Sequence, residues 1–361
     1  ALFKAAAAEA PKKIWTFNAQ SLSRTAWAFA TAGVSAPALF EAVAAEGARR
    51  VDEFRPSELA EITWAFARAD AYAENAQLFK AVALEAPKKM VALDAEALSR
   101  LVWAFAKTGA RAPNLFESAA AAARKKLLVF TPRQMSDAVW AYATAEVRVP
   151  ALFAGVVVEA RRKMAAFEPR DLANTAWAFA AAGFDAPELF EAVAGESRKK
   201  LETFGAQDLA ATAWAFAEAR ISAPQLFDAV AEVALGKMDS FDGEAVSRIV
   251  WAYARARVSG ARADALFEAA AAAVLSEASF HADDVARVAW AFAAYSETAS
   301  ATDLALFDAA ALRLDARMHE CGADASAQLH QVSVHLEQEA PGHVLTLLLG
   351  RHAAALRPAA P

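Results

Sequence analysis

Two variable positions in a repeated segment carry side chains that could hydrogen-bond to the bases of a nucleic acid. Each repeat contains one tryptophan, and offset 0 is defined here as the residue five before it, which is Leu22 in the first repeat. Offset 2 holds, in order, Arg24, Glu61, Arg100, Asp137, Asn174, Ala211, Arg248 and Arg287. Offset 9 holds Thr31, Arg68, Lys107, Thr144, Ala181, Glu218, Arg255 and Ala294.

These residue types match a modular reader of single-stranded bases, in which one repeat contacts one base through a pair of side chains. Arginine and lysine can pair with guanine, asparagine with adenine, and acidic side chains with cytosine. The alternative is that offsets 2 and 9 are ordinary solvated positions, where any polar residue is accepted. Both interpretations stay open at the level of sequence.

Offset 6 is alanine in all eight repeats. At 100° per residue, offsets 2, 6 and 9 of a helix fall within about 60° of one another. We therefore expect an exposed alanine platform between the two variable side chains, opposite the buried offsets 0, 4, 7 and 8. The tryptophans are expected in the core, where replacement by alanine costs about 3–5 kcal/mol.

A second candidate site is a periodic row of cations, eleven residues after the leucine of a recurring Leu-Phe pair. The row holds Lys13, Arg50, Lys89, Lys126, Lys163, Lys200, Lys237, Glu277 as the exception, and Arg317. A periodic cationic edge could follow a phosphate backbone and give salt-dependent binding. The alternative is that these cations stabilise the C-terminal ends of helices through the helix dipole.

The elements that carry these residues form a long repeat array. Tryptophan recurs at intervals of 37 to 39 residues, at Trp27, Trp64, Trp103, Trp140, Trp177, Trp214, Trp251 and Trp290. A period of this length is typical of stacked helical hairpins, each of which buries its apolar stripe only against its neighbours. The sequence predicts an all-α protein, a right-handed α-solenoid of about eight to nine hairpins over residues 1–318. Residues 319–361 are expected to form a degenerate capping hairpin and a tail.

Within one hairpin, the spacing predicts helix A from Pro37 to about residue 54 and helix B from Ser57 to about residue 69. Proline suits the first turn of a helix, because its missing N–H costs nothing there. Gly33, Gly109 and Gly183, with Asp70 at the equivalent place, are candidate C-caps of helix B. No strand-like alternation is present.

Composition and motifs exclude several classes of protein. The longest uncharged run, residues 25–40, has 16 residues, whereas a membrane-spanning helix needs about 20, so we expect no membrane insertion. The net charge of −6 argues against unspecific coating of nucleic acid. Nucleotide-binding, hydrolase and zinc-protease motifs are absent, so neither enzymatic activity nor a cofactor is expected. Cys321 lies near His319, His330 and His335, but without a second cysteine the spacing does not predict a metal site.

The chain resembles the octotricopeptide and heptatricopeptide repeat proteins, a class of helical-hairpin arrays often associated with a RAP domain. The resemblance rests on cores such as Leu172 followed by residues 177–180 (Trp-Ala-Phe-Ala), on Gly183, and on residues 187–190 (Pro-Glu-Leu-Phe), and it covers about residues 1–318. It implies an organellar protein, in a plastid or mitochondrion, that binds single-stranded RNA in transcript processing, stability or translation, with no specificity for DNA. Neither a targeting segment nor a RAP domain is visible.

The resemblance makes offsets 2 and 9 the candidate RNA contacts. The alternative is an architectural or assembly subunit of a large organellar complex, such as a ribosome or a photosynthetic or respiratory assembly, which binds protein partners through the solenoid surface.

Overall fold

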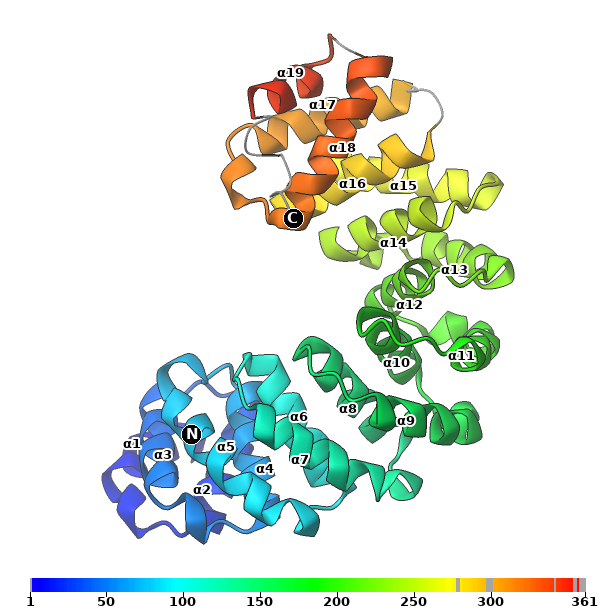
Figure 1. Ribbon diagram of the computed structural model, residues 1–361. Coiled ribbons are helices and arrows are strands. Elements are labelled where there is room, and N and C mark those ends of the chain that lie inside the picture. The colour runs from blue at the N-terminus through cyan, green and yellow to red at the C-terminus, as the bar shows by residue number, and fades with distance from the viewer. Residues whose placement is uncertain (1, 277–279, 297–300, 341, 353–355, 357–361) are drawn as a thin grey trace. The chain divides into compact units, whose positions relative to one another are not determined.

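The computed structural model describes residues 2–276, 280–296, 301–340, 342–352 and 356, and every regular element among them is helical (Figure 1). The chain divides into two compact units, residues 1–189 and residues 190–361. The predicted all-α fold is confirmed. The exception at Glu277 in the cationic row lies outside the described residues.

The helices alternate between two layers. The odd-numbered helices correspond to helix A and are α1 (Leu2–Glu9), α3 (Pro37–Arg49), α5 (Ala76–Lys89), α7 (Pro113–Arg124), α9 (Pro150–Lys163), α11 (Pro187–Lys200), α13 (Pro224–Gly236), α15 (Ala261–Ser276) and α17 (Ala301–Leu314). The even-numbered helices correspond to helix B and are α2 (Ala19–Ala32), α4 (Pro56–Arg68), α6 (Ala95–Thr108), α8 (Pro132–Thr144), α10 (Pro169–Ala181), α12 (Ala206–Glu218), α14 (Gly243–Ala256) and α16 (Ala282–Tyr295).

Packing within each unit follows the order expected of a helical-repeat array. Even-numbered helices pack on the next even-numbered helix, and the odd-numbered helices from α1 to α9 and from α13 to α17 pack on the next odd-numbered helix (Figure 1). The contacts between even-numbered neighbours are the more extensive. The handedness of the array stays a prediction.

Helix A is shorter than the sequence predicts. In the second hairpin it ends at Arg49, and a separate 3-10 turn, η2 (Val51–Glu53), follows before α4. The same turn recurs as η1 (Pro11–Thr16), η4 (Met90–Ala92), η5 (Leu127–Val129), η6 (Met164–Ala166), η7 (Leu201–Thr203), η8 (Met238–Ser240) and η9 (Met318–Glu320). A further turn, η3 (Ala73–Asn75), precedes α5.

Helix B ends as predicted, with a residue in the left-handed conformation. The φ angles of Gly33, Gly109 and Gly183 are 63°, 67° and 60°, and Asp70 has a φ of 52°. Three further non-glycine residues adopt the same conformation after α8, α12 and α14, namely Glu146, Arg220 and Arg257. A side chain with a Cβ is strained there by about 1 kcal/mol.

The core lies between the two layers and consists of aromatic pairs inside each hairpin. Phe40 of α3 meets Phe66 of α4 edge to face, with ring centroids 4.9 Å apart. Phe190 and Phe216 repeat the arrangement at 5.0 Å. These aromatic side chains are almost fully buried, so offset 7 of helix B and the Leu-Phe pair of helix A form the hydrophobic core.

Residues after α17 fold into α18 (Ala323–Glu339) and α19 (Val344–Arg351). Helix α18 packs on α16 and α19, and α19 also packs on α17. Leu329, Val332 and Leu336 of α18 are fully buried. Part of the expected tail, residues 341, 353–355 and 357–361, lies outside the described residues.

Candidate nucleic-acid interface

The solvent-facing side of helix B is centred on other positions than the sequence suggests. Offsets 0, 1, 3, 4 and 7 are buried in nearly every even-numbered helix, and so is offset 6. The exposed stripe consists of offsets −2, 2, 5 and 9, which lie within about 60° of one another on a helix. The expected alanine platform is therefore wrong: Ala65, Ala104, Ala141 and Ala178 have no exposed surface. In α4, α6, α8, α14 and α16, offset 6 is buried because an even-numbered helix packs on each side.

The tryptophans are the central residues of this stripe and do not belong to the core. Trp27 is 38% exposed, and the other seven are half-buried. Consecutive indoles approach one another: Trp140 lies 6.4 Å from Trp103 and 6.5 Å from Trp177, measured between ring centroids. The expectation that the tryptophans lie in the core is therefore wrong. The flat, half-exposed rings instead form a row on the surface of each unit.

A second indole row in the other unit joins Trp214, Trp251 and Trp290, with centroids 6.2 and 6.0 Å apart. Packed helices have axes about 8–10 Å apart, so the indoles are closer to one another than the helices that carry them. Together with the closer packing of the even-numbered layer, this indicates that the tryptophans line the inner, concave side of each unit.

A hollow of about 320 Å³ crosses this face in the unit formed by residues 1–189. It is lined by residues from five successive even-numbered helices, Thr31, Trp64, Arg68, Arg100, Trp103, Arg133, Asp137 and Arg170. Four guanidinium groups and two indole rings thus converge on one surface depression. This combination binds phosphates through charge and bases through stacking.

Two of the predicted base contacts lie over the indoles. The guanidinium of Arg100 is 5.7 Å from the centroid of the Trp64 ring, and the ammonium of Lys107 is 5.7 Å from that of Trp103. Both distances fit a cation–π interaction. Arg100 also pairs with Glu96 at 2.5 Å, and Lys107 pairs at 2.8 Å with Asp70.

The remaining side chains at offsets 2 and 9 differ in whether they form ion pairs or hydrogen bonds within the protein. Arg24, Arg68 and Arg255 form no ion pair with any residue that the structure describes, and Asn174 is half-buried. The carboxylate of Glu61 accepts a hydrogen bond from the Ser23 hydroxyl at 3.0 Å.

In the second unit, two arginines at offset 2 are held by acidic residues. Arg248 pairs with Glu244 at 2.5 Å. Arg287 pairs with Asp284 at 3.1 Å and donates to the Ser247 hydroxyl at 2.8 Å.

The carboxylate of Asp137 accepts a hydrogen bond from the guanidinium of Arg133 at 2.9 Å. Arg133 therefore lies beside a predicted RNA contact. A second carboxylate, Asp171, lies 3.9 Å from the same guanidinium. Burial raises the pKa of the Asp171 carboxyl above its ordinary value, and the charge of Arg133 opposes this rise.

The charge of the stripe differs between the two units. At offsets −2, 2, 5 and 9, the five helices α2 to α10 carry six cations and three acids, whereas α12 to α16 carry three of each. The whole chain has a net charge of −6. The stripe of residues 1–189 is therefore a positive surface on an acidic protein.

The cations of the row in helix A, unlike those of the stripe, mostly contact backbone carbonyl groups. The ammonium of Lys163 donates to the backbone carbonyls of Leu128 and Phe130, both at 2.7 Å. Three other lysines make the same double contact with the 3-10 turn of the preceding repeat, Lys89, Lys126 and Lys237.

The arginines of the row behave alike. Arg50 donates to the carbonyl of Phe17 at 2.9 Å, and Arg317 to that of Phe280 at 3.0 Å. Lys200 pairs with Glu196 at 3.1 Å, and Lys13 is exposed. These contacts link successive hairpins. Contact with a phosphate stays a prediction, and it would require most of these cations to leave backbone acceptors.

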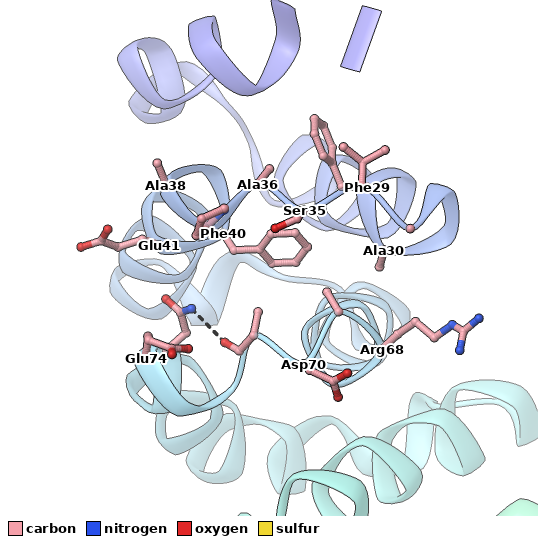
Figure 2. A pocket seen from close by; sticks show the side chains of 16 residues that line it. Phe29, Ala30, Ser35, Ala36, Ala38, Phe40, Glu41, Arg68, Asp70 and Glu74 are labelled. Carbon is pink, nitrogen blue, oxygen red and sulfur yellow. Dashed lines mark hydrogen bonds between the residues drawn. The ribbon is translucent and has the colours of Figure 1, made fainter. Parts of the chain in front are cut away.

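A larger hollow, of about 700 Å³, lies where the turn after α2 faces the turn after α4. Figure 2 shows Glu41 and Glu74 at one side of it and Arg68 extending away from them at the other. Asp70 adds a third carboxylate to its lining. Its acidic character disfavours a phosphate, so the smaller hollow on the stripe is the better candidate interface.

Arg133, Arg170 and the exposure of the tryptophans were not expected from the sequence. Offset −2 lies four residues before offset 2 and therefore shares its face, a signal that was available in the helical period. The exposure of the indoles had no such signal, because a recurring aromatic at helical spacing is equally typical of a core.

Among the residues that the structure describes, every helix is too short or too polar to span a lipid bilayer. In the same residues, no group of three or more histidine, cysteine or acidic side chains could hold a metal ion. Burial raises the pKa of the Cys321 thiol to about 11.

A comparison with protein-family models returned a match over residues 45–301, more than two thirds of the chain. The family is described as RESC6, RNA-editing substrate-binding complex 6 protein. No curated protein matches the sequence significantly. The resemblance is confirmed as far as a family of helical-repeat proteins from an RNA-editing complex, and the octotricopeptide and heptatricopeptide class itself stays a prediction.

Proposed function

Because the chain belongs to the RESC6 family of RNA-editing substrate-binding complex proteins, we propose that it binds single-stranded RNA through the exposed stripe of its even-numbered helices. In this proposal the protein is a non-catalytic subunit of an organellar RNA-binding complex. The family's complex is mitochondrial, which favours a mitochondrion over a plastid. The finer roles in transcript processing, stability or translation follow from the octotricopeptide resemblance.

The observation that carries the proposal is the hollow in which Arg68, Arg100, Arg133 and Arg170 surround Trp64 and Trp103. Stacking of a base on an aromatic side chain contributes about 1–3 kcal/mol and tolerates any sequence. Arginines supply phosphate contacts and can also pair with base edges. Rings half-exposed on a concave surface are accessible to unpaired bases, whereas a duplex keeps its bases stacked inside.

The test is binding of fluorescent single-stranded RNA to the wild type and to an Arg68→Gln, Arg100→Gln variant. The variant is expected to lose at least tenfold in affinity, because two cations of the hollow are removed. An Arg124→Gln, Lys125→Gln variant removes the same charge from the odd-numbered layer and serves as the matched control. Equal affinity of the wild type and the stripe variant would reject the proposed interface, and duplex RNA or single-stranded DNA that competes equally well would reject the proposed ligand.

A second candidate function, contact with protein subunits of the complex, is favoured by an apolar edge in the first unit. Val91, Leu128 and Val129 lie on the adjacent turns η4 and η5 and are 83%, 70% and 68% exposed. The ammonium of Lys126 donates to the carbonyl of Val91, so these turns are direct neighbours. Exposed apolar patches of this kind mark protein interaction sites.

This candidate predicts that the protein co-purifies with a large complex that resists ribonuclease. A Val91→Ser, Leu128→Ser variant should dissociate from that complex and keep its affinity for RNA. Release of the wild type by ribonuclease would instead mean that RNA alone holds it there.

A further inference from the structure

Arg133 and Arg170 occupy a place in their helices that opposes the helix dipole. Each follows the proline that starts its helix, Pro132 in α8 and Pro169 in α10. The first turn of a helix favours acidic residues, since its free N–H groups carry a partial positive charge. The same offset in the other six tryptophan-bearing helices, α2, α4, α6, α12, α14 and α16, holds Gln20, Ser57, Glu96, Gln207, Glu244 and Asp283. Only these two adjacent helices carry a cation there.

The two arginines are also only partly neutralised. Arg133 pairs with Asp137 at 2.9 Å and lies 3.9 Å from Asp171, and Arg170 forms no ion pair with any described residue. Both side chains line the hollow that also contains Arg68 and Arg100. A cation that breaks a local preference without an evident structural gain is expected at a functional site.

We propose that the phosphate backbone of the bound strand crosses the N-terminal ends of α8 and α10, where Arg133 and Arg170 hold successive phosphodiester groups. This inference rests on the proposed RNA-binding function. It assigns the phosphates and the bases of the strand to different positions along the stripe. Phosphates lie along offset −2, while bases lie over the indoles at offset 5 and meet the variable side chains at offset 9. The salt-dependent anchoring of the strand then lies in residues 1–189, because offset −2 is neutral or acidic in α12, α14 and α16.

The experiment measures the affinity of the full chain for random-sequence single-stranded RNA between about 50 and 200 mM salt. Each phosphate contact to a single strand contributes about −0.7 to the slope of log K against log salt concentration. An Arg133→Gln, Arg170→Gln variant should therefore lose about 1.4 from the magnitude of this slope. An Arg133→Lys, Arg170→Lys variant, which keeps the charge, should retain most of it.

A matched control, Arg124→Gln with Arg161→Gln, removes two exposed cations from α7 and α9 of the odd-numbered layer and should leave the slope unchanged. Inorganic phosphate at the same ionic strength should compete only weakly if a strand is the ligand. If the Arg133→Gln, Arg170→Gln variant still binds RNA and shows the same salt slope as the wild type, this inference is wrong and the proposed function still stands. An equal loss of slope in the control would overturn the inference too, whereas a wild type that binds no RNA would overturn both proposals.

Discussion

At the scale of single residues, two aromatic side chains two positions apart in the same helix have opposite roles. Trp103 is half-buried on the stripe, and Phe105 is 1% exposed in the core. Trp103→Ala should reduce affinity for single-stranded RNA by about 1–3 kcal/mol, the contribution of one stacked base. The Trp103→Ala substitution should lower the free energy of unfolding less than Phe105→Ala does. For Phe105→Ala a loss of about 3–5 kcal/mol is expected.

Urea denaturation and RNA-binding anisotropy on both variants separate the two roles. A Trp103→Ala protein that is as unstable as Phe105→Ala and binds RNA normally would show that the indole belongs to the core after all.

The ion pairs of Glu85 make the stability of the fold depend on pH. Hydrogen bonds from Lys88, and then from Lys89, hold the pKa of the Glu85 carboxyl below its ordinary value of 4.5. A carboxyl whose pKa is lower in the folded state stabilises the fold above its unfolded-state pKa, and this contribution is lost as the pH falls through the folded-state pKa. Glu85→Gln should therefore be less stable than the wild type at neutral pH, and the difference should disappear in acid. Denaturation curves at neutral pH and in steps below pH 4.5 check this, and a gap that persists at low pH would point to lost packing instead.

At the scale of elements, the left-handed residue at the end of helix B offers a direct test of the cap. Glu146 has a φ of 55° and an exposed side chain. Glu146→Gly should raise the free energy of unfolding by up to about 1 kcal/mol, because glycine adopts this conformation without strain. Gly183→Ala, at the equivalent position after α10, should lower it by a similar amount. Thermal or chemical denaturation of both variants measures the effect, and changes of the same sign would contradict the cap assignment.

The lysines of the odd-numbered layer act between elements. Lys126→Met removes hydrogen bonds to the carbonyls of Val91 and Leu93. Hydrogen bonds to charged groups contribute about 1.5–3 kcal/mol, and partial exposure of Lys126 should keep the loss near the lower end. The salt dependence of RNA binding should stay at the wild-type value. A stable Lys126→Met variant with a reduced salt slope would return this row to the phosphate-binding role considered from the sequence.

The sequence was sufficient for the order, number and approximate limits of the helices, since proline entries, glycine caps and the tryptophan period are local signals. It was not sufficient for the orientation of helix B. That orientation depends on both even-numbered neighbours, which bury Ala104 and Ala141 and leave Trp103 and Trp140 half-exposed. The partners of Lys163 are 35 and 33 residues away, beyond any local pattern. Position alone placed Arg68, Arg100 and Lys107 on the exposed face, and their role in RNA binding stays a prediction.

At the scale of the whole molecule, two units with similar helical packing present stripes of different charge. The first stripe carries an excess of cations, and the second is balanced. In a repeat array each hairpin contacts only its neighbours, so charge can vary from repeat to repeat without a change of fold. The membership of the RESC6 family and the apolar edge at Val91, Leu128 and Val129 are consistent with a protein that holds RNA on one surface and subunits on another.

The most direct test of this account is photo-crosslinking of the full chain to single-stranded RNA that contains 4-thiouridine, followed by mass spectrometry of the crosslinked peptides. The account predicts crosslinks in the even-numbered helices, concentrated around Trp64 and Trp103, and few in the odd-numbered helices. Crosslinks that gather on α5, α7 and α9 instead would contradict it.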